Sequence, residues 1–419
     1  MVTRRGFLKA GGLALFAVGT GGSPLFLSRA ALAAAPTLPY KKKKVLVAIF
    51  QRGAMDGLMA VTPFEDAYYR ESRPRLAMAT TGTEANLIDL DGRFGLHPAL
   101  GPLRTLFDEK RLAIVHGIGS PNTTRSHFDA QDYMESGTPD RKGTDTGWLN
   151  RVAAQVREGA TPFQAVAMTP ALPRSLYGNA PALAISDIGA FGVRVPHNMP
   201  LTQAAGATFE SLYDQASQEL LRDTGRESFE AIDMLRKIDV AHYVPSGGAE
   251  YPASQLGKAL RQIAQLIRAD LGLEVAFAEC SGWDTHVQQG TANGNFARPA
   301  RDLALSIGAF WKDIEPYQDD VVLMTMTEFG RTVAENGSGG TDHGRASCMF
   351  VLGNSVAGGS IYGTVPPLAP ENLADGRDLP VTTDFRSLFA DVAGTQFGIR
   401  DDRLVFPEWE GKRMKIMSA

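Results

Sequence analysis

Cysteine is nearly absent from this chain: only two occur among 419 residues, Cys280 and Cys348. So few thiols exclude a small fold held together by disulfide bonds, and a chain of this length can bury an apolar core without them. Both cysteines lie in or beside apolar runs typical of strands. We therefore expect two buried free thiols, with a disulfide bond between them as the less favoured alternative.

Long apolar runs and an excess of basic charge are also missing. The apolar stretch at residues 10–27 is interrupted by five glycines and a proline, so it lacks the ~20 strongly apolar residues that a membrane-spanning helix requires. Acidic residues outnumber basic ones, 46 to 42, whereas nucleic-acid binding requires a basic surface. These absences predict a protein with no stable membrane anchor and no nucleic-acid partner.

The first residues have the pattern of an export signal. Residues 3–9 contain the pair Arg4-Arg5, a mildly apolar stretch follows, and residues 31–33 fit a cleavage site between small side chains. A twin arginine is an address read by a receptor, not an anchor. We expect residues 1–33 to be a twin-arginine signal peptide and the twin-arginine translocase to be a partner during export. The folded domain would then act in the periplasm or outside the cell.

A recurring order of strand, glycine-rich loop and helix begins after residue 40. Short apolar runs predict strands at 45–50, 112–116, 163–168, 182–185, 275–277, 321–326 and 349–352. Helical periodicity covers 202–240 and 256–270, and 296–317 has the pattern of a crossover helix. This alternation predicts an α/β fold, a three-layer α/β/α sandwich with a mostly parallel, doubly wound sheet. We expect one domain over residues 40–419 with a helical insertion near 200–270.

Chemically capable side chains gather in the loops expected at the carboxyl ends of those strands. In chain order they are Asp56, Ser126, Asp284, His286, Glu328, Arg331, Asp342 and His343. Carboxylates and imidazoles are ligands for Zn²⁺ or Mn²⁺, and two ions ~3.5–4 Å apart can clamp a displacement at phosphorus. A hydroxyl at a helix N-terminus, such as that of Ser126, adds backbone N–H groups for an anion. Arg331 and Arg345, which flank the glycine-rich segment 337–344, could hold a phosphate or sulfate.

Several of these residues also have an ordinary structural interpretation. Asp56 precedes a glycine, as in common turns. Ser126 with Asp129 matches a helix capping box, and either arginine could pair with a surface acid. The pair Asp342-His343 is different, because a glycine-rich turn does not require an adjacent carboxylate and imidazole. We therefore favour a functional role for that pair.

The motifs around these residues resemble those of a family of exported bacterial proteins, the domain of unknown function 1501 family. The shared motifs are FQRGAMDGL at 50–58, SHF at 126–128, GWDTH at 282–286, EFGRT at 328–332 and NGSGGTDHG at 336–344. They extend over nearly the whole chain after the signal. That family is similar to a distant branch of the alkaline phosphatase and sulfatase superfamily. The resemblance implies an alkaline-phosphatase-like sandwich with metals at the strand ends.

The same resemblance implies a role for each matched residue. Ser126 would be the hydroxyl nucleophile. One or two divalent ions (Zn, Mn or Ca) would be held by five ligands: Asp56, Asp284, His286, Asp342 and His343. The chain departs from the superfamily pattern because Asp284 and His286 are two residues apart rather than four, and no histidine follows His343. One metal site is therefore expected to be rebuilt with Glu328 or another group, reduced to a single metal, or lost.

Two functional hypotheses follow. The first is an exported, metal-dependent hydrolase of phosphate or sulfate esters, small or polymer-borne, in which Ser126 attacks in line and Arg331 or Arg345 stabilises the anion. The alternative is a non-catalytic binding or assembly protein that retains the fold, because a fold does not determine a function. A serine hydrolase that pairs Ser126 with His127 is disfavoured, since adjacent residues on one helical turn do not face each other.

Overall fold

The computed structural model describes residues 43–83, 85–156, 161–191, 230–232, 234 and 242–418. The expected signal peptide at residues 1–33 lies outside these residues, and so does most of the helix expected at 202–240. In the part of the chain that is described, no helix is both long and apolar enough to cross a membrane.

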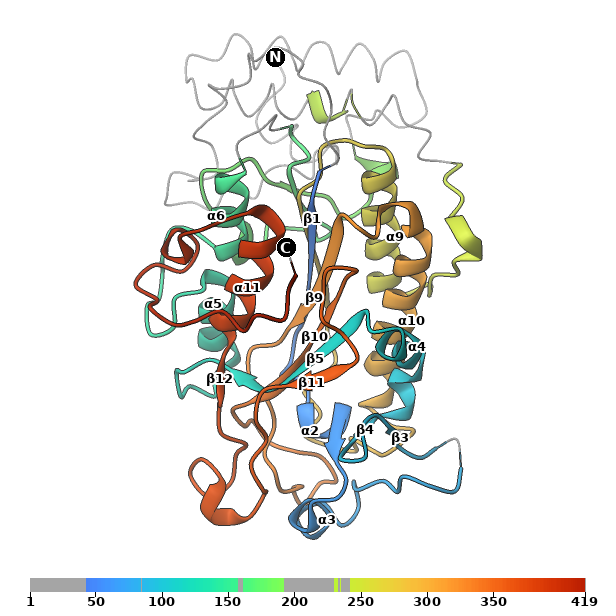
Figure 1. Ribbon diagram of the computed structural model, residues 1–419, viewed down its shortest axis with the longest axis vertical. Helices are drawn as coiled ribbons and strands as arrows, with labels where there is room; N and C mark the ends of the chain where they lie inside the picture. Colours follow the sequence, from blue (N-terminus) through green and yellow to red (C-terminus); the bar gives the residue numbers. More distant parts are fainter. Residues whose placement is uncertain are drawn as a thin grey trace, which may run out of the picture.

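A nine-stranded sheet runs through the centre of the molecule (Figure 1). Its order is β11-β5-β10-β9-β1-β8-β6-β7, with β12 beside β5. The strands are β1 (Val45–Gln51), β5 (Leu112–Gly119), β6 (Ala165–Ala167), β7 (Leu183–Ala184), β8 (Val275–Cys280), β9 (Val321–Met326), β10 (Ser347–Leu352), β11 (Ser360–Tyr362) and β12 (Thr383–Asp384). Among the described strands of this sheet, β10 alone pairs antiparallel, with β5 and β9. The mostly parallel sheet predicted from the sequence is confirmed.

The strands at the middle of this sheet are buried on both faces. In β1, Val47 and Ile49 enter one apolar core, whereas Ala48 and Phe50 enter the other. Successive side chains of a strand point to opposite faces, so covering both faces requires an uninterrupted apolar run. This is why residues 45–50 show no alternation of polar and apolar residues.

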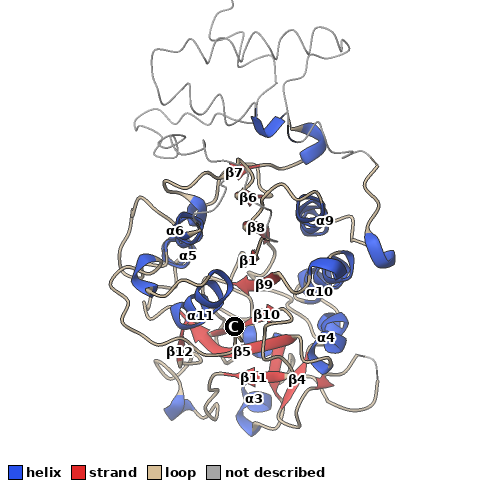
Figure 2. Ribbon diagram, turned by 45° about the horizontal axis from the view of Figure 1, so that its top comes forward, coloured by secondary structure: helices blue, strands red, loops and turns tan. Residues whose placement is uncertain are grey.

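Helices cover both faces of the sheet (Figure 2). One layer contains α4 (Arg104–Asp108), α9 (Gln255–Arg268) and α10 (Ala297–Asp313), and the other contains α5 (His127–Ser136), α6 (Trp148–Gln155) and α11 (Phe385–Phe397). Within the second layer, the rings of Trp148 and Phe389 lie 4.7 Å apart. The three-layer α/β/α sandwich is therefore confirmed.

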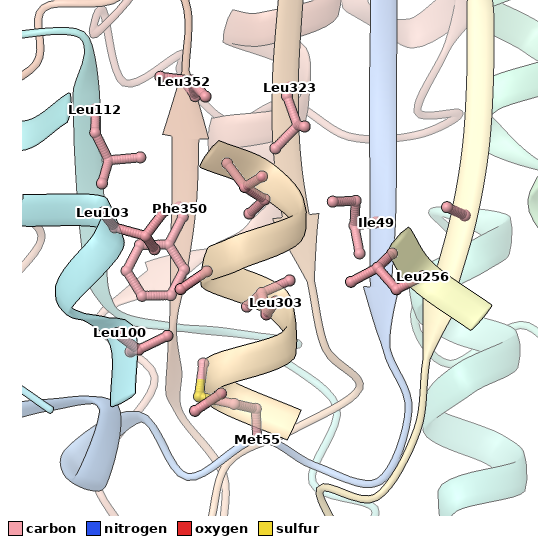
Figure 3. Packing of buried hydrophobic residues seen from close by; sticks show 14 of the residues in the cluster. Ile49, Met55, Leu100, Leu103, Leu112, Leu256, Leu303, Leu323, Phe350 and Leu352 are labelled. Atoms are coloured by element: carbon pink, nitrogen blue, oxygen red, sulfur yellow. The ribbon is translucent and has the colours of Figure 1, made fainter. Parts of the chain in front are cut away.

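The crossover helix α10 packs along the centre of one face. Figure 3 shows its Leu303 in the same core as Ile49 of β1, Leu323 of β9 and Phe350 of β10. Burying one leucine side chain of this kind contributes roughly 1.5–3 kcal/mol. The helix ends at Asp313 and a 3₁₀ turn follows at Glu315–Tyr317, because a proline at position 316 disfavours α-helical geometry in the residue before it.

Shorter elements cover the end of the molecule that β1 points toward (Figure 1). They are α2 (Gly57–Ala60), α3 (Ala67–Ser72) and the three-stranded sheet of β2 (Val61–Pro63), β3 (Ile88–Asp89) and β4 (Phe94–Leu96). The chain reaches them through a tight turn in which Gly53 has φ of 115° and Ala54 of 65°. A Cβ atom on Gly53 would lie 2.7 Å from the backbone nitrogen of Asp284. The missing side chain therefore lets the turn after β1 touch the loop after β8.

Two smaller expectations have different outcomes. Cys280 and Cys348 are free thiols, as predicted, and burial raises the pKa of Cys280 to about 12. The capping box at Ser126 and Asp129 is wrong. Ser126 is the N-cap residue of α5, but its side chain makes no capping hydrogen bond, and Asp129 instead pairs with Lys142 at 2.7 Å.

Candidate metal centre

Four loops meet at the carboxyl edge of the central strands. They follow β1, β5, β8 and β9, which run in the same direction because β10 is antiparallel to both β5 and β9. The loop after β9 folds back on itself through a bridge between Arg331 and His343. Parallel strands bring their carboxyl ends to one edge, so residues far apart in the sequence become neighbours here.

Three imidazoles converge at this edge through the same ring atom. The Nε2 atom of His343 lies 3.0 Å from Nε2 of His127 and 2.9 Å from Nε2 of His286. His127 begins α5, His286 follows β8, and His343 precedes β10. Two of these residues were expected at the site; His127 was not.

The other ring nitrogen of each imidazole faces a hydrogen-bond acceptor. The Nδ1 atoms of His127 and His286 lie 2.8 Å from Glu328 Oε1 and Asp342 Oδ1, respectively. The Nδ1 atom of His343 lies 2.9 Å from the carbonyl oxygen of Arg125. A carbonyl oxygen can only accept, so Nδ1 of His343 carries the proton and Nε2 carries a lone pair.

Both carboxylates are held in the ionised form, which also only accepts. Burial opposes ionisation of Glu328, but hydrogen bonds from His127, Gln131 and the Gly53 backbone outweigh it and hold its pKa below the usual value. The hydrogen bond from His286 lowers the pKa of Asp342. All three imidazoles are therefore oriented with Nδ1–H outward and Nε2 toward one another.

Without a cation, the protein can satisfy this convergence of nitrogens only by adding protons to the imidazoles. Hydrogen bonding to Glu328 raises the pKa of His127, and burial lowers that of His343, so a protonated His127 can donate one hydrogen bond to His343. The single lone pair of His343 Nε2 cannot also accept a full hydrogen bond from His286. A protonated His286 would have to donate to Asp284 Oδ1 instead, at 3.0 Å. A divalent cation takes up such lone pairs without added protons, and metal-bound histidines characteristically donate their second nitrogen to a carboxylate or carbonyl.

Buried histidines elsewhere in the chain have the opposite arrangement. In His97 and His116, Nδ1 accepts a backbone N–H at 3.1 and 2.9 Å, whereas Nε2 lies 3.0 and 2.9 Å from a backbone carbonyl oxygen. Their lone pairs are used within the fold, so these two histidines are structural.

Asp284 supplies a carboxylate to the same centre. Its Oδ1 atom lies 3.0 Å from His286 Nε2 and 3.2 Å from His343 Nε2, and its Oδ2 atom lies 3.5 Å from His127 Nε2. Arg331 Nη1 donates to Oδ1 at 2.6 Å. Burial raises the pKa of Asp284, but this guanidinium outweighs the effect and the pKa is lowered. Asp284 is therefore a carboxylate directed at the three imidazoles.

The separations fit a small divalent ion. Ligand atoms of a tetrahedral zinc ion lie roughly 3.3 Å apart, given Zn–N distances near 2.0 Å. Potential ligand atoms of His127, Asp284 and His343 lie within 4.8 Å of one another. His286 borders this group through its contacts with His343 and Asp284. No other group of this kind occurs among the described residues.

Asp56, expected to be the first-strand ligand, lies outside this cluster. It is buried and paired with Arg73, which donates to both carboxylate oxygens at 2.8 and 3.1 Å. Gln289 donates to Oδ2 at 2.7 Å, and the backbone of Met59 donates to Oδ1 at 3.1 Å, capping α2. These four hydrogen bonds occupy the carboxylate, so the structure gives Asp56 a supporting role and not that of a ligand.

The other predicted residues divide between the centre and its surroundings. Asp342 lies behind His286 and contacts its Nδ1 atom, not the cluster of Nε2 atoms. Arg331 is buried, and its donors face Asp284 and Thr341, so it orients a ligand instead of being open to an anion. Arg345 differs, because its Nε atom is buried without a hydrogen-bond partner and it forms no ion pair among the described residues.

Ser126 lies beside the centre, because both of its neighbours in the chain take part in it. The preceding residue, Arg125, accepts from His343 through its carbonyl oxygen, and the following residue is His127. The side chain of Ser126 is half-buried and leaves the backbone of α5 uncapped. A free hydroxyl next to two metal-ligand candidates is consistent with the nucleophile that the sequence suggested.

His127 is the residue that sequence reasoning missed. The sequence suggests for it only the role of a base for the adjacent Ser126, and adjacent residues on one helical turn do not face each other. The available signal was its position in a shared motif at a helix start, together with the lack of a histidine after His343. The third imidazole comes from upstream, and Glu328 supports it without joining the ligands.

Comparison with known proteins identifies the family. Residues 43–408 match the family described as Protein of unknown function (DUF1501), and the chain belongs to that family. A search of curated proteins gave no match.

Among solved structures, the C-terminal periplasmic domain of EcEptC from Escherichia coli, in complex with Zn, is 10% identical, with 89% of each chain covered and a TM-score of 0.40. The lipoteichoic acid synthase LtaP from Listeria monocytogenes is also 10% identical, with 78% of this chain and 67% of that chain covered and a TM-score of 0.33. An alkaline phosphatase from the Antarctic bacterium TAB5 is 11% identical, with 75% and 93% covered and a TM-score of 0.30. Likenesses this distant support no conclusion about function. Any such conclusion has to come from the site itself.

Proposed function

We propose that this member of the DUF1501 family is an exported, metal-dependent hydrolase of phosphate or sulfate esters. One observation carries the metal: the Nε2 atoms of His127 and His286 each lie within 3.0 Å of His343 Nε2, while the Nδ1 atom of each ring faces an acceptor. Export rests on the twin-arginine pattern at the start of the sequence, and the twin-arginine translocase would be the partner in that step.

The donor set favours zinc and a single ion. Three imidazoles and one carboxylate suit Zn²⁺, whereas Ca²⁺ prefers an all-oxygen set, so calcium falls behind zinc and manganese among the ions considered. Among the described residues, one group of potential ligand atoms is close enough to share an ion, that of His127, Asp284 and His343, and Asp56 is occupied by Arg73. The two-ion arrangement is therefore replaced by a one-ion site in this proposal.

The residues around the ion would each have a defined task. Ser126 would present its hydroxyl to the phosphorus or sulfur atom. Arg345, which lacks an ion-pair partner among the described residues, would bind the anionic oxygens of the ester. Glu328 and Asp342 would keep two imidazoles in the Nδ1–H form. When bound, the ion supplies Lewis-acid polarisation and lowers the pKa of a hydroxyl group near it.

A binding or assembly protein with a structural ion is the second candidate. The observation in its favour is that His286 adds a fourth side chain beside the group of His127, Asp284 and His343. Four protein ligands are typical of closed structural zinc sites, whereas catalytic sites retain an open position. Under this alternative the metal stabilises the loops and Ser126 has no chemical role.

Turnover and metal content, measured together, separate the two candidates. The exported protein would be assayed for zinc by mass spectrometry and for hydrolysis of an aryl phosphate and an aryl sulfate. The hydrolase predicts about one zinc per chain, activity that chelation removes and zinc restores, and loss of activity in Ser126→Ala with zinc retained. The exposed Ser360→Ala variant is the control. Bound zinc without turnover on either ester would favour the structural role, and protein without bound metal would exclude both.

A further inference from the structure

A chain of polar contacts continues behind His127, away from the metal centre. Glu328 Oε1 accepts from His127 Nδ1 at 2.8 Å and from Gln131 Nε2 at 2.9 Å. The amide oxygen of Gln131 in turn accepts from Arg52 Nη1 at 3.1 Å. The chain therefore runs from an arginine through an amide and a buried carboxylate to a candidate ligand.

The direction of this chain is fixed by its ends. Arg52 can only donate, so it requires the oxygen end of the Gln131 amide and turns the NH₂ group toward Glu328. Glu328 is fully buried, and its Oε1 atom also accepts from the Gly53 backbone at 2.9 Å. Two protein donors therefore hold this oxygen in place before His127 adds a third.

Arg52 is itself held by three groups. It pairs with Glu135 at 2.7 Å and Glu279 at 2.8 Å, and its guanidinium carbon lies 4.1 Å from the centre of the Phe50 ring. Glu135 is anchored by the backbone of Ser175 at 3.0 Å. These contacts give Arg52 little freedom to move away from Gln131.

The helix explains how these residues form one stripe. His127, Gln131 and Glu135 are each four residues apart in α5, so they lie on one face of the helix. The turn after β1 brings Arg52 against this face. The spacing H-x₃-Q-x₃-E is visible in the sequence, although its partner Arg52 is not.

We propose that Gln131 and Arg52 are positioning residues for the metal centre: through Glu328 they hold His127 as the Nδ1–H tautomer, with Nε2 free for the ion. This inference rests on the proposed function, because it assigns His127 as a ligand. Removing the group that directly contacts a metal-bound histidine, here Glu328, typically weakens metal affinity about 10–100-fold. Gln131 acts through Glu328, so its effect should lie at the lower end of that range.

The test uses the full exported protein and two independent readouts. Zinc affinity is measured by competition with a chelator. The tautomer of His127 is read from side-chain ¹⁵N shifts in the metal-free protein, at a pH high enough for the ring to be neutral. Gln131→Leu removes the amide but keeps a side chain of similar size. Arg52→Lys keeps the charge that balances Glu135 while losing the planar fork. The matched control is Asp132→Asn, the next residue on α5, which loses its 2.9 Å ion pair with Arg174 but does not contact Glu328.

We expect about tenfold weaker zinc binding in Gln131→Leu, a smaller loss in Arg52→Lys, and none in Asp132→Asn. We also expect wild-type His127 to be the Nδ1–H tautomer and Gln131→Leu to mix both tautomers. Wild-type affinity and an unchanged tautomer in Gln131→Leu would overturn the inference. If the wild-type protein binds no zinc, the proposed function fails, and the tautomer measurement still decides whether Gln131 positions His127.

Discussion

His286 and His343 approach each other through their Nε2 atoms at 2.9 Å, while their Nδ1 atoms face Asp342 and the Arg125 carbonyl at 2.8 and 2.9 Å. With their outer nitrogens protonated, these half-buried rings present only lone pairs to each other unless a cation or an added proton lies between them. By fixing the outer nitrogen of each ring, the fold turns the inner nitrogens toward each other, which is the orientation that a bound cation requires.

The ligands and their supports should respond differently to mutation. His343→Ala removes a central nitrogen, so we expect bound zinc to fall from about one equivalent per chain to a trace. Asp342→Asn leaves all four candidate ligands and should retain zinc with about 10–100-fold weaker affinity. Mass spectrometry and chelator competition measure the two effects, with His242→Ala as the control. Equal losses in the two variants would place Asp342 among the ligands, as the sequence first suggested.

The buried pair of Asp56 and Arg73 predicts a loss of stability without a loss of metal. Asp56→Asn leaves the Arg73 guanidinium buried without its counter-charge, which typically costs about 3–5 kcal/mol. The free energy of unfolding in urea measures this loss. Asp108→Asn breaks the exposed pair with Arg104 at 2.8 Å and should lower stability by less than about 1 kcal/mol. Folded Asp56→Asn protein that has lost its zinc would show that Asp56 contributes to the metal site after all.

The framework of the fold could be predicted from the sequence because burial on both faces leaves a strong local signal. The apolar runs at 45–50 and 321–326 correspond to β1 and β9 almost residue for residue. The helix expected at 256–270 matches α9 because leucines and isoleucines recur with its period. The direction of β10 was not predicted, since strand direction depends on the path of the connecting loop.

The site could be predicted only as a set of loops. Asp342 and His343 are adjacent in the sequence, yet only the side chain of His343 points into the centre. The backbone conformation of the loop decides which of two neighbouring side chains faces inward. Asp56 stands at the end of a strand, as a ligand would, but its partner Arg73 lies 17 residues away beyond α2, β2 and α3. Pairings of this kind are tertiary, so no local pattern reveals them.

Arg345 should affect substrate binding and leave the metal in place. Its side chain is half-buried and its Nη2 atom donates to the Pro121 carbonyl at 3.3 Å, so an anionic oxygen would supply the counter-charge that the described residues do not. Arg345→Ala should raise KM for an aryl phosphate or sulfate by about tenfold, equivalent to ~1.4 kcal/mol, with zinc content unchanged. Arg403→Ala, at an exposed arginine paired with Asp401, is the control. Unchanged steady-state constants in Arg345→Ala would remove Arg345 from the substrate site.

The structural histidines predict that the protein loses stability as the pH falls below about 6.5. Burial lowers the pKa of both His97 and His116 to about 4 in the folded state, against about 6.5 in the unfolded chain.

Above pH 6.5 both residues are neutral in either state and contribute no pH dependence. Between pH 6.5 and 4 the unfolded chain binds the protons first, so the free energy of unfolding falls by up to about 1.4 kcal/mol per pH unit for each histidine. His116→Gln can still donate to the Val61 carbonyl but cannot titrate, so its stability should fall less steeply over this range. Urea unfolding of metal-free protein at several pH values measures both slopes. The other titrating groups are common to the two proteins, so equal slopes would mean that His116 is already protonated in the folded state near pH 6.5.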